Sequence, residues 1–106
     1  MAVFRILLKM QIKAGLGPDF EKAWYSIGDV ISGHPANLGQ WLLRSGDEEN
    51  LYYIMSDWVG ETEFREFEKS DQHLEHRQKL HPYREQGSMA TMHVVYDMAK
   101  IRSGAR

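Results

Sequence analysis

Three side chains suited to proton transfer and anion binding lie in one short stretch of the chain: His73, His76 and Arg77. Because His73 and His76 are three residues apart, they would be neighbours on the surface of a helix. A neutral imidazole can take a proton near neutral pH. A guanidinium is always charged and donates from a planar fork, so it can hold the anion that remains. The stretch therefore predicts a site that deprotonates an acidic substrate, with solvated side chains on an exposed helix face as the alternative.

Other chemistries find little support in the sequence. The chain contains no cysteine, which excludes disulfides, thiolate metal sites and cysteine nucleophiles. No serine lies in a nucleophile-elbow sequence, and no glycine-rich phosphate loop follows a predicted strand. His73, His76 and His81 could hold a metal on paper, but the spacing turns His81 away from the other two on a helix and no acidic residue completes the set. We therefore expect no metal site.

Aromatic side chains could line a flat, apolar slot for a ligand. The candidates are Trp24, Tyr53, Trp58 and Tyr96. Rings of this kind stack on and orient a polycyclic molecule. His93, on the last predicted strand, either faces the same slot or is a satisfied core histidine. For each aromatic residue the alternative is simple core filling in a small domain.

Composition limits the partners and the location. A net charge of −2 favours neither nucleic acid nor an anionic membrane as a partner. The apolar run 6–8 is bracketed by Arg5 and Lys9 and is too short for a signal peptide or a membrane span, so a cytoplasmic protein is expected. The 106 residues predict one domain, 1–106, in which 99–106 form a flexible, solvated tail.

The elements that must position these residues follow from the hydrophobic periods. Apolar residues alternate from Phe4 to Ile12, which predicts a strand with one buried face. Apolar residues at spacings of four, three and four predict a helix over 20–31, begun by Pro18. Strands are predicted at 38–45 and 51–58, around a polar turn at 46–50.

The second half repeats the pattern of helix and strand. A helical stretch over 61–81 is expected to split at Ser70–Asp71, because serine and aspartate favour caps over helix interiors. After a loop at Gly87–Ser88, a last strand is predicted from Met89 to Met98.

The resulting order, β-α-β-β-α-β, predicts a ferredoxin-like α+β fold, a four-stranded antiparallel sheet with both helices on one face. Large side chains such as Trp41 and Tyr52 cannot all point at the helices, because neighbours in a strand alternate. A sheet with a bare apolar face usually finds a partner. We therefore expect a homodimer in which two sheets pack face to face as a closed barrel.

One run of residues resembles a known family. A strand ends at Trp58, the helix Thr62–Phe67 follows, and Lys69–Ser70–Asp71 leads into the helix that carries His73, His76 and Arg77. From Phe4 to about Met98 the chain is similar to the antibiotic biosynthesis monooxygenases, small dimeric α+β-barrel proteins.

The resemblance implies a function. Some members of that family oxidise aromatic polyketide anthrones to quinones with molecular oxygen, using no metal, haem or flavin, while relatives degrade haem, isomerise small acids or cyclise polyketides. In the anthrone oxygenases a Trp, an Asn and an Arg are the residues usually discussed. Trp58 and Arg77 match by position, whereas Ile54 stands at the Asn position. The haem-degrading members use an axial His where Arg77 stands, so haem degradation is less expected.

The leading hypothesis is therefore a cofactor-independent monooxygenase that acts on an aromatic polyketide of anthrone or phenol type. Its catalytic residues would be His73, His76 and Arg77, and its substrate-binding residues Trp24, Tyr53, Trp58, His93 and Tyr96. Its partners would be a second copy of the chain, a flat aromatic substrate and molecular oxygen, with no cofactor. The alternatives are a polyketide cyclase or another non-oxidative enzyme on the same scaffold, and a non-catalytic ligand-binding protein.

Overall fold

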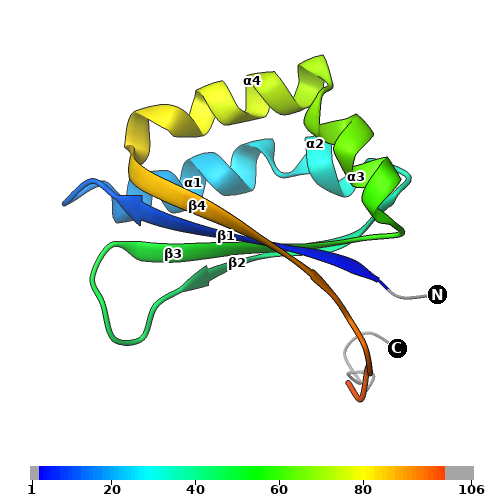
Figure 1. Cartoon of the computed structure of the whole chain (residues 1–106). Coiled ribbons are helices and arrows are strands. Elements are labelled where there is room, and N and C mark those ends of the chain that lie inside the picture. Colours follow the sequence, from blue (N-terminus) through cyan, green and yellow to red (C-terminus); the bar gives the residue numbers. More distant parts are fainter. Residues whose placement is uncertain (1–2, 100–106) are drawn as a thin grey trace, which may run out of the picture.

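The computed structural model describes residues 3–99, which form one four-stranded antiparallel sheet with helices on one face (Figure 1). The elements in chain order are β1 (Phe4–Ile12), α1 (Gly17–Ile27), α2 (Asp29–Ser32), β2 (Asn37–Arg44), β3 (Leu51–Trp58), α3 (Glu61–Glu68), α4 (Asp71–Leu80), the 3₁₀ turn η1 (His81–Tyr83) and β4 (Arg84–His93). The strands lie in the order β2-β3-β1-β4. The predicted ferredoxin-like α+β fold is confirmed.

The central strand β1 has the predicted alternation. Phe4, Ile6 and Ile12 are buried against the helices, and Arg5 and Leu7 point to the opposite face. β1 pairs with β3 on one side and β4 on the other. All helices therefore share the face on which the buried residues of β1 lie.

The predicted bounds of the last strand are wrong. β4 runs from Arg84 to His93, and Gly87 and Ser88 lie inside it, paired with Met10 and Lys9. Continuous pairing with a central strand outweighs the weak strand propensity of these two residues. The strand ends where its partner ends, and the N–H of Val94 donates to the carbonyl of Val3 at 2.9 Å. Of the predicted tail 99–106, residues 100–106 lie outside the described part of the chain.

The helical stretches behave differently from each other. The first was predicted as one helix over 20–31, but it begins at Gly17 and breaks at Gly28, which lies between α1 and α2. Glycine is a poor helix-interior residue, which explains the break. The second splits as predicted: Ser70 caps α4, and its Oγ accepts from the backbone N–H of His73 at 3.2 Å.

The helix-covered face of the sheet holds the core. One cluster surrounds Trp58, Phe64 and Phe67, and a second surrounds Phe20 and Tyr52. The Tyr52 hydroxyl donates to the carboxylate of Glu21 at 2.6 Å, which gives this buried phenol a partner.

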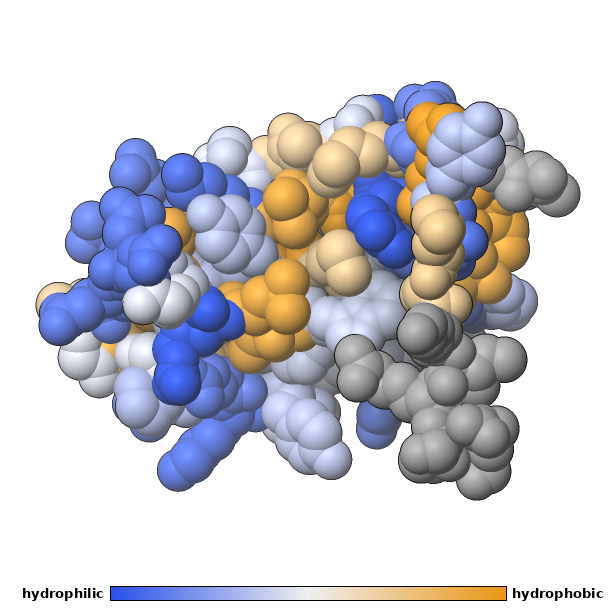
Figure 2. All heavy atoms as spheres, turned by 90° about the horizontal axis from the view of Figure 1, so that it is seen from below, coloured by the Kyte–Doolittle hydropathy of each residue, from blue (hydrophilic) through white to orange (hydrophobic). Residues whose placement is uncertain are grey.

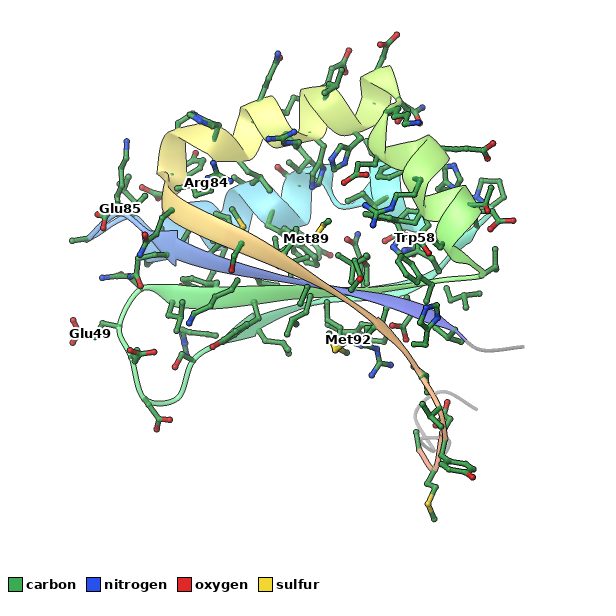
Figure 3. All side chains as sticks on the ribbon, in the orientation of Figure 1. Glu49, Trp58, Arg84, Glu85, Met89 and Met92 are labelled. Carbon is green, nitrogen blue, oxygen red and sulfur yellow. The ribbon has the colours of Figure 1, made fainter. Side chains whose placement is uncertain are left out.

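No helix within residues 3–99 covers the other face of the sheet. Trp41 and Leu43 are each 42% exposed, and register places Trp41 in a row with Met55 and Leu7, and Leu43 beside Tyr53. Met92 is 38% exposed and lies beside Arg5. Figure 2 shows this open face, with apolar side chains over its middle and charged side chains toward the β2–β3 turn. Figure 3 shows Met92 on the open side of the sheet, whereas Met89 and Trp58 lie on the helix side.

The open face also carries one charged pair. The Arg5 guanidinium donates to both carboxylate oxygens of Asp57, at 2.6 and 2.8 Å. Hydrogen bonding to Asp57 raises the pKa of Arg5. None of the helices in residues 3–99 combines the length and the apolar character that crossing a membrane requires.

Candidate functional site

A cavity of about 320 Å³ lies between the helix-covered face of the sheet and helices α3 and α4. Its apolar walls come from β1, β3 and α3, among them Ile6, Ile54, Phe64 and Phe67. This volume is at the lower end of the range for small-molecule sites, and concave, mostly apolar walls are typical of them. The cavity therefore suits a compact aromatic ligand.

Trp58 forms one wall of the cavity. It is the last residue of β3, is only 1% exposed, and its ring centroid lies 5.0 Å from that of Phe67 and 5.4 Å from that of Phe64. Its indole N–H donates to the Oγ of Ser56 at 3.0 Å. The indole is thereby fixed in orientation, so it offers a rigid apolar surface to a ligand.

Helix α4 brings three polar side chains to the cavity: His73, His76 and Arg77. His73 is half-buried and His76 is 6% exposed. Burial lowers the pKa of His73, the positive charge of Arg77 lowers it further, and Glu68 acts in the opposite direction. The three residues predicted to be catalytic therefore line the same cavity.

His76 is uncharged at neutral pH. Burial, followed by the neighbouring His73, lowers its pKa to about 4, although a hydrogen bond to the backbone of Ile27 opposes the shift. A bond that favours the protonated ring is one in which the imidazole donates. Because Nδ1 has no partner among the described residues, we assign the donor as Nε2–H. The lone pair of neutral His76 is then on Nδ1, a buried atom that has no partner among the described residues.

Arg77 and Arg84 place two guanidiniums at the cavity, from the last turn of α4 and the first residue of β4. Neither takes part in an ion pair within residues 3–99. Glu68, the acidic residue that lines the cavity, accepts from Arg65 instead, at 3.1 Å. The two guanidiniums thus remain available to an anionic group on a ligand.

Four of the predicted substrate-binding residues do not line this cavity. Trp24 packs against the cluster around Phe20, and Tyr53 points to the open face because it alternates with the buried residues of β3. His93 lies at the far end of β4, with its ring 5.3 Å from that of Phe4. Tyr96 follows the strand and is 88% exposed. Of the predicted substrate-binding residues, Trp58 alone therefore lines this cavity, and the expected slot of Trp24, Tyr53, Trp58 and Tyr96 is not formed here.

Several cavity residues were not identified from the sequence. Ser56 could have been found, because it is two residues before Trp58 and so shares its face. Arg84 was missed because the last strand was predicted to start at Met89, five residues too late. Gln40 depends on the register between β2 and β3, which the sequence does not give. Among residues 3–99, no group of three or more histidine, aspartate or glutamate side chains could hold a metal ion.

The model of the family described as antibiotic biosynthesis monooxygenase matches residues 3–79. A curated relative, protein SchA of Streptomyces halstedii, is 26% identical over 101 residues. The match covers 95% of this chain and 27% of SchA, so the chain spans about a quarter of the length of that relative.

Solved structures share the fold. SnoaB from Streptomyces nogalater, a cofactor-independent oxygenase, superposes with a TM-score of 0.81 at 16% identity over 94% of this chain and 100% of its own. A conserved protein from Methanosarcina mazei gives a TM-score of 0.78 at 14% identity, over 87% of this chain and 92% of its own.

Proposed function

This chain belongs to the antibiotic biosynthesis monooxygenase family, and from that premise we propose that it is a cofactor-independent monooxygenase. Its substrate is an aromatic polyketide intermediate with an acidic C–H or phenol group, of anthrone type. The single observation that carries the proposal is the apolar cavity, which is lined both by an uncharged, buried His76 and by an Arg77 that forms no ion pair in residues 3–99. The similarity to SnoaB in fold supports the same reaction class.

The residues of the cavity suit a deprotonation followed by oxidation. Nδ1 of His76 takes a proton from the substrate, and the guanidinium of Arg77 holds the resulting enolate or phenolate. The electron-rich anion passes one electron to molecular oxygen, and recombination of the radical pair forms a C–O bond. Loss of water from the peroxide then leaves a carbonyl where the substrate had a CH₂ group. One oxygen atom enters the product and the other leaves as water, so no external reductant is needed.

A pKa of about 4 makes His76 a weak base in the empty site. Formation of a substrate anion beside it favours the imidazolium, because opposite charges raise the pKa of a histidine. The same low value keeps the ring unprotonated at neutral pH and ready to accept a proton. His73 shares the cavity and is the second candidate for the base.

Oxygen uptake tests this function. Protein that has been dialysed and treated with a chelator should consume one molecule of oxygen for each molecule of anthrone converted to anthraquinone. A product at the same oxidation level as the substrate, formed equally well without oxygen, would show a cyclase or another non-oxidative enzyme. Binding without any conversion would show a ligand-binding protein. Activity that is lost with the chelator and restored by one metal would contradict the cofactor-free reaction.

The proposal includes a homodimer formed through the open face of the sheet. Trp41, Leu43 and Met92 expose apolar surface there, on the two edge strands of the sheet. A second copy of the same face would cover this surface and would leave each cavity between its own sheet and helices. The paired Arg5 and Asp57 enter such an interface already satisfied by each other.

A further inference from the structure

Gln40 on β2 is held in one orientation at the wall of the cavity. Its Nε2 donates to the carbonyl of Gly28 at 2.8 Å and to the Oγ of Ser32 at 2.9 Å. A carbonyl oxygen can only accept a hydrogen bond, so the NH₂ group of the amide must face Gly28. The break between α1 and α2 therefore fixes which end of the Gln40 amide is the oxygen.

The Oε1 of Gln40 has no partner among the described residues, although it is buried. Buried side-chain oxygens are nearly always hydrogen-bonded, and an unsatisfied one is costly, so the exception calls for a missing partner. Three of the four buried polar atoms without a partner belong to residues that line this one cavity, Gln40, His73 and His76. The unsatisfied groups thus gather where a ligand is expected.

Ser56 lies next to Gln40 on the same face of the sheet. The two residues are directly paired in the β2–β3 register, and both line the cavity. The Oγ of Ser56 accepts from Trp58, and no acceptor for its own hydroxyl proton is present among the described hydrogen bonds. An acceptor and a donor therefore stand side by side, which is the arrangement that one hydroxyl group of a ligand satisfies completely.

We propose that the Oε1 of Gln40 accepts a hydrogen bond from a hydroxyl group of the aromatic substrate, so that the cavity selects hydroxylated rings over their unhydroxylated analogues. The inference rests on the proposed function and adds a residue to it. An amide oxygen favours a neutral O–H donor, whereas Arg77 favours an anion. The substrate is thereby oriented, with a neutral hydroxyl at the β2 wall and the developing charge toward α4.

The test measures binding without turnover. Anthrone and its isomeric monohydroxyanthrones are titrated one by one in the absence of oxygen, with tryptophan fluorescence and calorimetry as readouts. At least one isomer should bind the natural protein about fivefold more tightly than anthrone, as expected for one net hydrogen bond. Gln40→Met, which is similar in volume, should remove that preference and leave the Kd of anthrone within about twofold.

Ser32→Ala is the matched control, because it removes one anchor of the Gln40 amide and leaves the acceptor oxygen. It should retain the preference for the hydroxylated isomer. If Gln40 is only a brace for the helix break, both variants lower stability and neither changes the preference, which overturns the inference. Equal binding of anthrone and every isomer to the natural protein also overturns it while the proposed function stands. Binding of no anthrone at all overturns the proposed function and this inference with it.

Discussion

The two faces of the sheet are formed by the same four strands. One face contains buried polar atoms without hydrogen-bond partners, and the other exposes apolar side chains. The helix-covered face is closed by packed aromatic rings and contains a cavity with unsatisfied polar atoms. The open face carries a charged pair, Arg5–Asp57, whose members satisfy each other, but it exposes large apolar side chains. Missing polar partners in a cavity point to a small ligand, whereas exposed apolar area points to a protein surface. The contrast supports the proposed catalysis on one face and the proposed assembly on the other.

The largest expected effect is on the helix-covered face, at Trp58. Trp58→Ala should lower the free energy of unfolding by about 3–5 kcal/mol, because it empties the centre of a packed cluster. Trp58→Phe should keep the fold and weaken anthrone binding. Tyr25→Ala, at a side chain that is 82% exposed, is the control and should change stability little. Urea unfolding measures all three, and a cost for Trp58→Ala no larger than that of the control would contradict the packing argument.

On the open face the effect should appear in assembly instead. Trp41→Glu places a charge at each of the two copies of an exposed apolar position and should weaken the dimer by about 3 kcal/mol. Light scattering coupled to size exclusion should give about twice the chain mass of 12.3 kDa for the natural protein and the single mass for the variant. Tyr25→Glu adds the same charge on α1 and should leave the dimer intact. A natural protein that is monomeric at micromolar concentration would contradict the proposed dimer.

The third effect is a dependence of stability on pH, which comes from His76 on the helix-covered face. Since the pKa of His76 is lowered to about 4 in the folded protein, the unfolded chain takes up this proton first as the pH falls below the ordinary value of 6.5. Unfolding is then favoured, and stability should fall by about 2 kcal/mol between pH 7 and pH 5. His76→Gln should remove most of this decline, whereas His81→Gln, at an exposed position, should keep it. An unchanged decline in His76→Gln would show that another group is responsible.

The sequence predicted the covered face better than the site within it. Alternation in β1 and the Ser70 cap of α4 are local signals that predicted two of its elements, and the family resemblance singled out Trp58 and Arg77, which line the cavity. The limits of β4 depend on how far its partner β1 extends, which no local pattern reports. Gln40 lines the cavity through the pairing of β2 with β3 and through the break at Gly28. Both features depend on tertiary structure, so no local sequence pattern marks Gln40 as a cavity residue.

The smallest expected effect tests whether Arg77 acts on the substrate anion or on binding of the neutral substrate. Arg77 is exposed and touches the cavity from its edge, so its loss should cost little stability. If its guanidinium holds an anion that exists only after deprotonation, Arg77→Ala should lower kcat about tenfold and change the Kd of anthrone by less than about twofold. Arg77→Lys keeps the charge without the planar fork and should recover part of kcat. Lys69→Ala removes an equal charge at an exposed position outside the cavity and should change neither constant. A loss in Kd that equals the loss in kcat/KM would instead make Arg77 a binding residue for the ground state, and Arg84 would then be the next guanidinium to test for the anion.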